Sequence, residues 1–108
     1  MQHQNQKLVD ITNYNKASLH VSRSLRYLYD GDYSKALTSI DKAIELNPNL
    51  AIAYARKGSI YVHLGQIKNA SINYNIALKL DPEFDEVREI LQALKTDQLK
   101  SADLEEKE

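Results

Sequence analysis

Three histidines, His3, His20 and His63, are the side chains of this sequence best suited to proton transfer near neutral pH. They stand far apart, and neither His20 nor His63 has a nucleophile or a carboxylate at a helix-face spacing that would orient it. The sequence also lacks a glycine-rich phosphate loop and a cluster of metal ligands. We therefore expect no enzyme activity, no cofactor and no metal, and we expect both histidines to lie on the surface or to line a groove.

Composition excludes further kinds of chemistry. Cysteine is absent from the 108 residues, which excludes disulfides, thiolate metal sites and cysteine nucleophiles. Residues 1 to 80 hold ten Lys and Arg against five Asp and Glu, whereas residues 81 to 108 hold four against ten. The basic residues are dispersed, so nucleic acid is not an expected partner. No apolar run approaches the roughly 20 residues that span a bilayer, and the polar start of the chain does not resemble a secretion signal, so the default location is cytoplasmic.

Two stretches of the sequence repeat each other without a gap. They are YLYDGDYSKALTSIDKAIELNP at residues 27 to 48 and YVHLGQIKNASINYNIALKLDP at residues 61 to 82. A constant offset of 34 residues relates them, so that Gly65 corresponds to Gly31. A constant offset indicates a structural unit that is used twice.

Each unit has the pattern of a helical hairpin. Apolar residues such as Leu37, Ile40 and Ile44 recur at spacings of three and four, the period of a helix with one buried face. Gly31 and Gly65 stand where a first helix should end, because glycine adopts the left-handed conformation at little cost. A proline ends each unit and can begin the next helix. The pattern predicts an all-α fold of stacked antiparallel helical hairpins, with helices at 17–29, 33–46, 51–64 and 67–80.

Aromatic, small and proline residues alternate at fixed positions of the two units. In the second unit they are Tyr54, Gly58, Tyr61, Ala70, Tyr74, Ala77 and Pro82. The first unit has Tyr27, Ala36, Ala43 and Pro48 at its matching positions and departs at the others, with His20, Ser24 and Ile40. Residues 17–50 and 51–84 therefore resemble the tetratricopeptide repeat (TPR) family. The resemblance implies an α-solenoid, in which the small residues let paired helices approach closely.

The two ends of the chain differ from the repeats. Residues 85–98 are expected to form a capping helix, because an apolar stripe from Phe84 to Leu94 lies opposite a charged face. The charged tail at 99–108 is expected to be frayed. For the polar residues 1–16 two interpretations remain open: they extend the first helix backward, or they are the remainder of an earlier repeat. Disorder up to about residue 6 is compatible with both.

The resemblance implies a protein–protein interaction module or adaptor, because this family mostly holds peptides or proteins on the inner face formed by the first helix of each pair. Carried over by position, the groove residues would be Val21, Ser22, Leu25, Tyr29, Ile52, Arg56, Ser59 and His63. Leu28 and Val62 belong to the same helices, and we expect neighbouring helices to cover them. The expected ligand is an amphipathic or extended peptide with apolar anchors and an acidic group for Arg56.

One known use of this family is a clamp for the carboxyl-terminal carboxylate of a partner, which needs lysines and asparagines on successive inner faces. Only Arg56 fits such a position, whereas Val21, Leu25 and Ile52 stand where polar clamp residues would be. The resemblance therefore argues against an adaptor for chaperone tails. A structural function is the alternative to peptide binding: two repeats fall below the usual three or more, which favours a homo-oligomer or a place in a longer repeat array.

Overall fold

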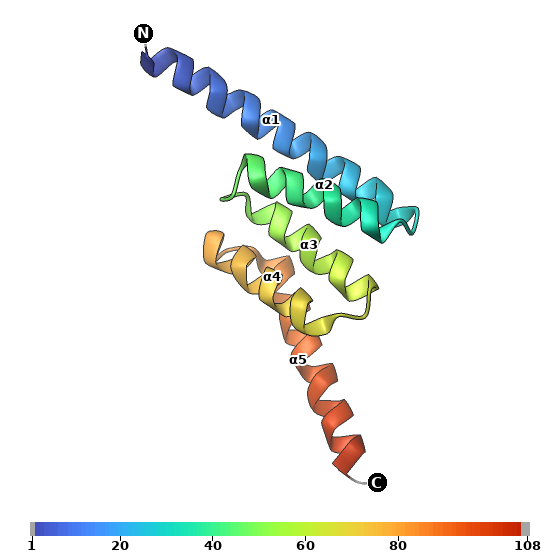
Figure 1. The fold of residues 1–108 in the computed structure, drawn as a ribbon. Helices are drawn as coiled ribbons and strands as arrows, with labels where there is room; N and C mark the ends of the chain where they lie inside the picture. The colour runs from blue at the N-terminus through green and yellow to red at the C-terminus, as the bar shows by residue number, and fades with distance from the viewer. Residues whose placement is uncertain (1, 107–108) are drawn as a thin grey trace.

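The computed structural model describes the backbone of residues 2–106 and the side chains of residues 7–97. The described backbone forms five helices, α1 (Gln2–Tyr29), α2 (Tyr33–Leu46), α3 (Ala51–His63), α4 (Ile67–Leu80) and α5 (Asp85–Glu106). Each helix packs against the next along the chain, and α1 also contacts α3, so the helices form a stack (Figure 1). The predicted all-α fold of stacked antiparallel helical hairpins is confirmed.

The two hairpin turns have the same geometry in both repeats. Gly31 and Gly65 have φ angles of 78° and 75°, the left-handed conformation that glycine was expected to supply. After each glycine a backbone amide reaches back to the last turn of the helix, from Asp32 to Tyr27 (2.8 Å) and from Gln66 to Tyr61 (2.9 Å). These bonds satisfy carbonyl groups that would otherwise be unpaired at the helix end.

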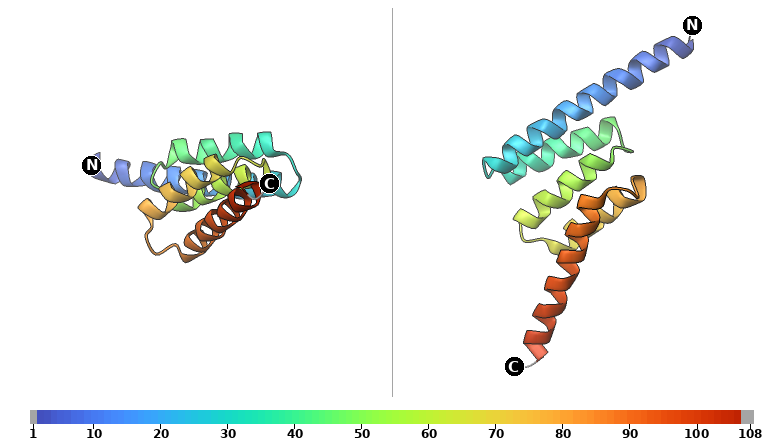
Figure 2. Two further views of the ribbon diagram at one scale, coloured as in Figure 1. Left: turned by 90° about the horizontal axis from the view of Figure 1, so that it is seen from below. Right: turned by 180° about the vertical axis from the view of Figure 1, so that it is seen from behind.

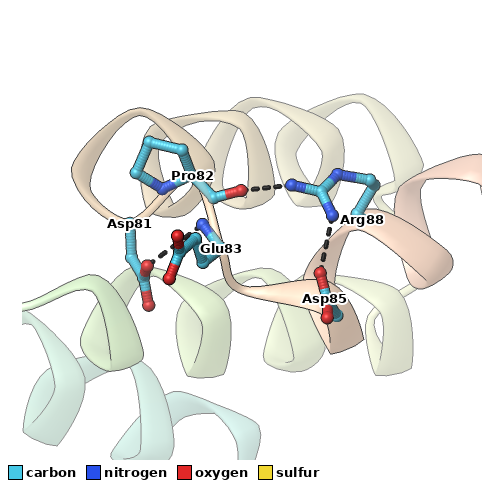
Figure 3. A network of polar contacts seen from close by, with 5 residues as sticks. All are labelled: Asp81, Pro82, Glu83, Asp85 and Arg88. Atoms are coloured by element: carbon cyan, nitrogen blue, oxygen red, sulfur yellow. Dashed lines mark hydrogen bonds and ion pairs between the residues drawn. The ribbon is translucent and has the colours of Figure 1, made fainter.

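The turns that follow the second helix of each repeat also match. Asn47 accepts a hydrogen bond from the backbone amide two residues later at 3.2 Å, and Asp81 does the same at 3.2 Å. In the second of these turns Arg88 donates to the carbonyl of Pro82 and pairs with Asp85 at 2.6 Å (Figure 3). Arg88 therefore links the first turns of α5 to the turn that precedes the helix.

Small side chains stand at the helix crossings, as the sequence predicts. Ala36, Ala43, Ala70 and Ala77 are fully buried, and Ser24 is 1% exposed. At Gly58 a Cβ atom would lie 2.8 Å from the ring of Tyr74, which is closer than side-chain atoms pack. The tyrosine ring therefore occupies the space that glycine leaves open.

Helix α5 covers the open face of the second repeat and continues beyond it. Val87 and Leu91 are buried against the cluster that includes Ala70 and Tyr74. The helix runs to Glu106, which differs from the prediction that it ends near residue 98 and that 99–108 are frayed. No glycine or proline follows Pro82, and residues such as Ala102 and Leu104 are good helix formers. Residues 107–108 lie outside the described part of the chain.

Helix α1 is continuous from Gln2 to Tyr29, so residues 2–16 extend the first helix backward. The side chains of residues 1–6, where we expected disorder, lie outside the described part. Leu8, Val9 and Ile11 remain more than half exposed. Figures 1 and 2 show the start of α1 and the end of α5 projecting past the stack at opposite ends. The molecule is elongated, with extents of 68 × 30 × 16 Å.

Candidate functional site

The predicted groove residues form two rows, one on α1 and one on α3. These helices contact each other. The rows occupy equivalent positions, because adding 34 to the numbers of Ser22, Leu25 and Tyr29 gives Arg56, Ser59 and His63 of the second row. Both rows therefore face the same side of the stack, which we call the inner face.

Exposure divides the eight predicted residues into three groups. Ser22, Tyr29 and His63 are exposed, with Tyr29 at 85%, whereas Leu25, Ile52, Arg56 and Ser59 are partly buried. Val21 is only 7% exposed and belongs to the core cluster with Ala17 and Leu28. It differs from the prediction because its position on α1 points toward the neighbouring helices, so it supports the inner face without offering surface to a ligand. Leu28 is covered in the same way, as expected, and Val62 is partly buried.

A chain of hydrogen bonds runs across α3 to α4. The Ser59 hydroxyl lies 3.2 Å from the carbonyl oxygen of Ala55 and 2.8 Å from the hydroxyl of Tyr74. The carbonyl can only accept, so Ser59 donates to it and Tyr74 donates to Ser59. Ser59 therefore positions Tyr74 and has no proton left for a ligand.

His63 is held by its own helix. Its Nδ1 atom donates to the carbonyl oxygen of Ser59 at 2.9 Å, and its ring lies 6.0 Å from the ring of Tyr33, centre to centre. In the neutral ring this leaves Nε2 as a hydrogen-bond acceptor for a ligand. His63 can thus contribute a polar contact at one end of the inner face.

Arg56 is the inner-face residue with unmet hydrogen-bonding capacity. Its Nε atom is buried and has no hydrogen-bond partner in the structure. Within residues 7–97, Arg56 forms no ion pair. A buried donor without an acceptor is costly, because folding removes the water that it would otherwise bond. Arg56 as a whole is only partly buried, so a carboxylate of a ligand could pair with the part of its guanidinium that remains accessible.

The positive charge of Arg56 affects the pKa of the Tyr74 hydroxyl. Burial raises the pKa of the Tyr74 hydroxyl, while the hydrogen bond with Ser59 and the positive charge of Arg56 oppose this rise and the negative charge of Glu86 adds to it. Arg56 on α3 and Glu86 on α5 therefore act on the Tyr74 hydroxyl in opposite directions.

The repeat offset also leads to positions on α5 that the predicted site omits. Adding 34 to Ile52, Arg56 and His63 gives Glu86, Ile90 and Asp97, so the repeat offset itself could have found them. Of these, Ile90 is partly buried and packs against the second core cluster, whereas the two acidic residues are exposed. The row on α1 is thus uncharged, Arg56 is the cation of the row on α3, and two of the three corresponding positions on α5 are acidic.

Family models of the tetratricopeptide repeat match residues 13–50 and residues 51–84. Together they cover two thirds of the chain, which therefore belongs to the tetratricopeptide repeat family. No helix in the described part of the chain is both long and apolar enough to cross a membrane. Within that part, no group of three or more His, Cys, Asp or Glu residues could hold a metal ion.

Curated relatives are much longer than this chain. Heat shock protein STI1 of Saccharomyces cerevisiae is 29% identical over 97 residues, covering 89% of this chain and 16% of that protein. Tetratricopeptide repeat protein 6 of Homo sapiens is 36% identical over 67 residues, covering 62% and 13%. The Hsp70-Hsp90 organizing protein of Triticum aestivum is 36% identical over 64 residues, covering 59% and 11%. The chain thus spans less than a fifth of the length of each.

Two solved structures resemble the fold. The first TPR of Spaghetti (RPAP3), bound to the HSP90 peptide SRMEEVD, has a TM-score of 0.73 and 23% identity, covering 78% of this chain and 68% of that one. The second TPR domain of human RPAP3, in complex with the HSP70 peptide SGPTIEEVD, has a TM-score of 0.69 and 28% identity, covering 74% and 67%. The first likeness shows the fold alone.

Proposed function

We propose that this chain is a peptide-binding module that holds a segment of a partner protein on the inner face of α1, α3 and α5. The observation that carries the proposal is the guanidinium of Arg56, which is partly buried on this face, has a buried Nε without a hydrogen-bond partner and forms no ion pair within residues 7–97. Leu25 and Ile52 are partly buried on the same face and offer apolar surface for side chains of the ligand. In this function the chain binds and does not catalyse.

The ligand class we propose is a peptide that combines apolar anchors with an acidic group. SRMEEVD and SGPTIEEVD, the peptides held by the two similar TPR domains, both have this composition. The apolar residues at the clamp positions argue against a chaperone peptide, and so does the acidic Glu86, whose charge acts on Tyr74 against that of Arg56. The solved complexes argue for it. These two peptides are therefore the first ligands to test.

Fluorescence anisotropy with labelled SRMEEVD and SGPTIEEVD tests the proposal directly. We expect Arg56→Gln to weaken binding by about tenfold or more, because a charge-assisted hydrogen bond contributes roughly 1.5 to 3 kcal/mol. Lys79→Gln, which removes the same charge from an exposed position on α4, should leave the affinity unchanged. Peptides with an amidated carboxyl terminus show whether the terminal carboxylate is the group that Arg56 recognises.

Leu25→Asp tests the apolar part of the face. We expect it to abolish peptide binding while the far-ultraviolet circular dichroism keeps its helical signal, because Leu25 is only partly buried. A loss of helicity would place Leu25 in the core. If the wild-type chain binds neither peptide, chaperone peptides are excluded as its ligands, and equal binding by Arg56→Gln would remove Arg56 from the site.

Self-association is the second candidate function. It is favoured by the apolar side chains of Leu8, Val9 and Ile11, which are more than half exposed on the extended part of α1. The solution mass of the chain distinguishes the two functions.

A further inference from the structure

A pocket lies on a different side of α1 from the inner face. It has a volume of about 240 Å³ and opens between α1 and α2. Its lining includes His20, Arg23 and Tyr27 from α1 and Lys35, Thr38 and Lys42 from α2. The α1 residues follow the three- and four-residue spacing of one helix face, whereas Ser22, Leu25 and Tyr29 follow that of another.

The positive charge around this pocket is not balanced by nearby carboxylates. Lys35 pairs with Asp32 at 3.7 Å, but Arg23 and Lys42 form no ion pair within residues 7–97. Burial lowers the pKa of His20, and the positive charges of Arg23 and Lys42 lower it further. Arg23 and Lys42 therefore both act electrostatically on His20, which lines the same pocket.

The second repeat shows that the fold does not require this polar set. At the positions of His20, Thr38 and Lys42 it has Tyr54, Ile72 and Ile76. The equivalent of Arg23 is Lys57, which is neutralised by Asp41 at 2.7 Å. Two repeats with the same backbone thus differ in this pocket, and only the first collects unpaired cations there.

We propose that the pocket between α1 and α2 binds a phosphate group, with Arg23, Lys42 and His20 as the residues that contact its oxygens. Several cationic donors around one small cavity suit an anion with two negative charges and several acceptor oxygens. The phosphate is either free in solution or an ester on a side chain of a partner protein. The site does not depend on the peptide-binding function of the inner face.

Nuclear magnetic resonance titration of the whole chain tests the proposal. The probes are inorganic phosphate and a capped Gly-phosphoserine-Gly peptide, each compared with chloride at the same ionic strength, because salt screens exposed charges. We expect saturable shifts of the His20 ring and of the Thr38 and Lys42 amides. We also expect the pKa of His20 to rise when phosphate is bound, since an anion stabilises the imidazolium form.

Variants taken from the second repeat provide the matched test. Lys42→Ile and Thr38→Ile introduce isoleucine, which the second repeat has at the equivalent positions, Ile76 and Ile72. We expect the phosphate affinity to fall by about tenfold or more in Lys42→Ile, in keeping with the loss of one charge-assisted contact. The control is Lys79→Ile, which removes a lysine from an exposed position on α4 and should bind phosphate as the wild type does.

The outcomes separate the sources of the phosphate. Tighter binding of the phosphoserine peptide than of inorganic phosphate supports a phosphorylated partner, whereas the reverse order supports a free phosphate ligand. The proposal is overturned if no saturable shift occurs, if Lys42→Ile binds as tightly as the wild type, or if the unphosphorylated peptide binds equally well. Inner-face binding of SRMEEVD should be unchanged in Lys42→Ile, so failure of either site leaves the other testable.

Discussion

At the scale of single residues, two opposite charges act on one tyrosine hydroxyl, that of Tyr74. The positive charge of Arg56 and the negative charge of Glu86 act on the pKa of Tyr74 in opposite directions. We expect both charges to act on a carboxylate of a ligand that binds at Arg56. The affinity for an acidic peptide depends on the balance between these two charges.

Neutralising Glu86 should strengthen the binding of an acidic peptide. We expect Glu86→Gln to tighten the binding of SRMEEVD by roughly threefold, because the repulsion between partly exposed charges is worth only a few tenths of a kcal/mol to about 1 kcal/mol. Fluorescence anisotropy measures the change. Glu83→Gln removes the same charge in the turn before α5 and serves as the control. Weaker binding in Glu86→Gln would mean that Glu86 contacts the ligand favourably.

The titration of Tyr74 reports on Arg56 without any ligand. Because burial raises its pKa above the ordinary 10.0, the folded state keeps the hydroxyl proton where the unfolded state loses it. This part of the stability is present below about pH 10 and is lost as the pH rises from there through the folded-state pKa. Removing the cation in Arg56→Gln should raise the pKa of Tyr74 further. Ultraviolet titration of each protein against its Tyr74→Phe counterpart isolates this hydroxyl, and an unchanged pKa would contradict the placement of Arg56.

At position 58 the structure leaves no room for a side chain. Alanine favours a helix more than glycine by about 1 kcal/mol, but its Cβ atom would lie 2.8 Å from the Tyr74 ring. We therefore expect Gly58→Ala to lower the free energy of unfolding, by about 1 to 3 kcal/mol, through overpacking. Urea denaturation measures this. In a Tyr74→Leu background the same change should cost less, and an equal cost in both backgrounds would show that the ring is not the obstacle.

At the scale of helices, α5 closes the stack. Its buried residues Val87 and Leu91 complete the cluster around Tyr74, while the opposite side of the helix is polar. The second repeat would otherwise present the apolar surface of α4 to water. A single helix therefore takes the place of a third repeat at this end.

Truncating one side chain of α5 tests its role in stability. We expect Leu91→Ala to lower the free energy of unfolding by about 2 to 3 kcal/mol, because the deletion of a buried leucine loses transfer free energy and leaves a cavity. Leu91 is 4% exposed, whereas its neighbour Gln92 is exposed, so Gln92→Ala is the matched control and should change the stability by less than about 0.5 kcal/mol. Thermal denaturation of both variants suffices. Similar stabilities would mean that α5 does not cap the stack.

At the scale of the whole molecule, the chain is elongated. Its Cα radius of gyration is 16.5 Å, against about 13 Å for a compact domain of this length. The projecting parts of α1 and α5 account for the difference (Figure 2). On the projecting part of α1, the apolar side chains of Leu8, Val9 and Ile11 remain exposed in the single chain.

Light scattering and small-angle X-ray scattering test this shape and the choice between the two functions. If α5 is a sufficient cap, we expect a mass of 12.3 kDa that does not change with concentration and a radius of gyration near 16.5 Å. A dimer that reverts to a monomer in the Leu8→Gln, Ile11→Gln double variant would instead assign the exposed part of α1 to self-association. That outcome would favour the structural function over peptide binding.

The sequence by itself determined the repeated unit, because a helical period, two glycines with positive φ and small residues at the crossings are local requirements of the backbone. It left the ends of the chain open, since no glycine or proline sets a boundary within α1 or α5. Tertiary structure alone decided that Val21 is buried and that Ser59 is committed to Tyr74. These facts depend on how helices distant in sequence pack, which a pattern along one helix does not contain.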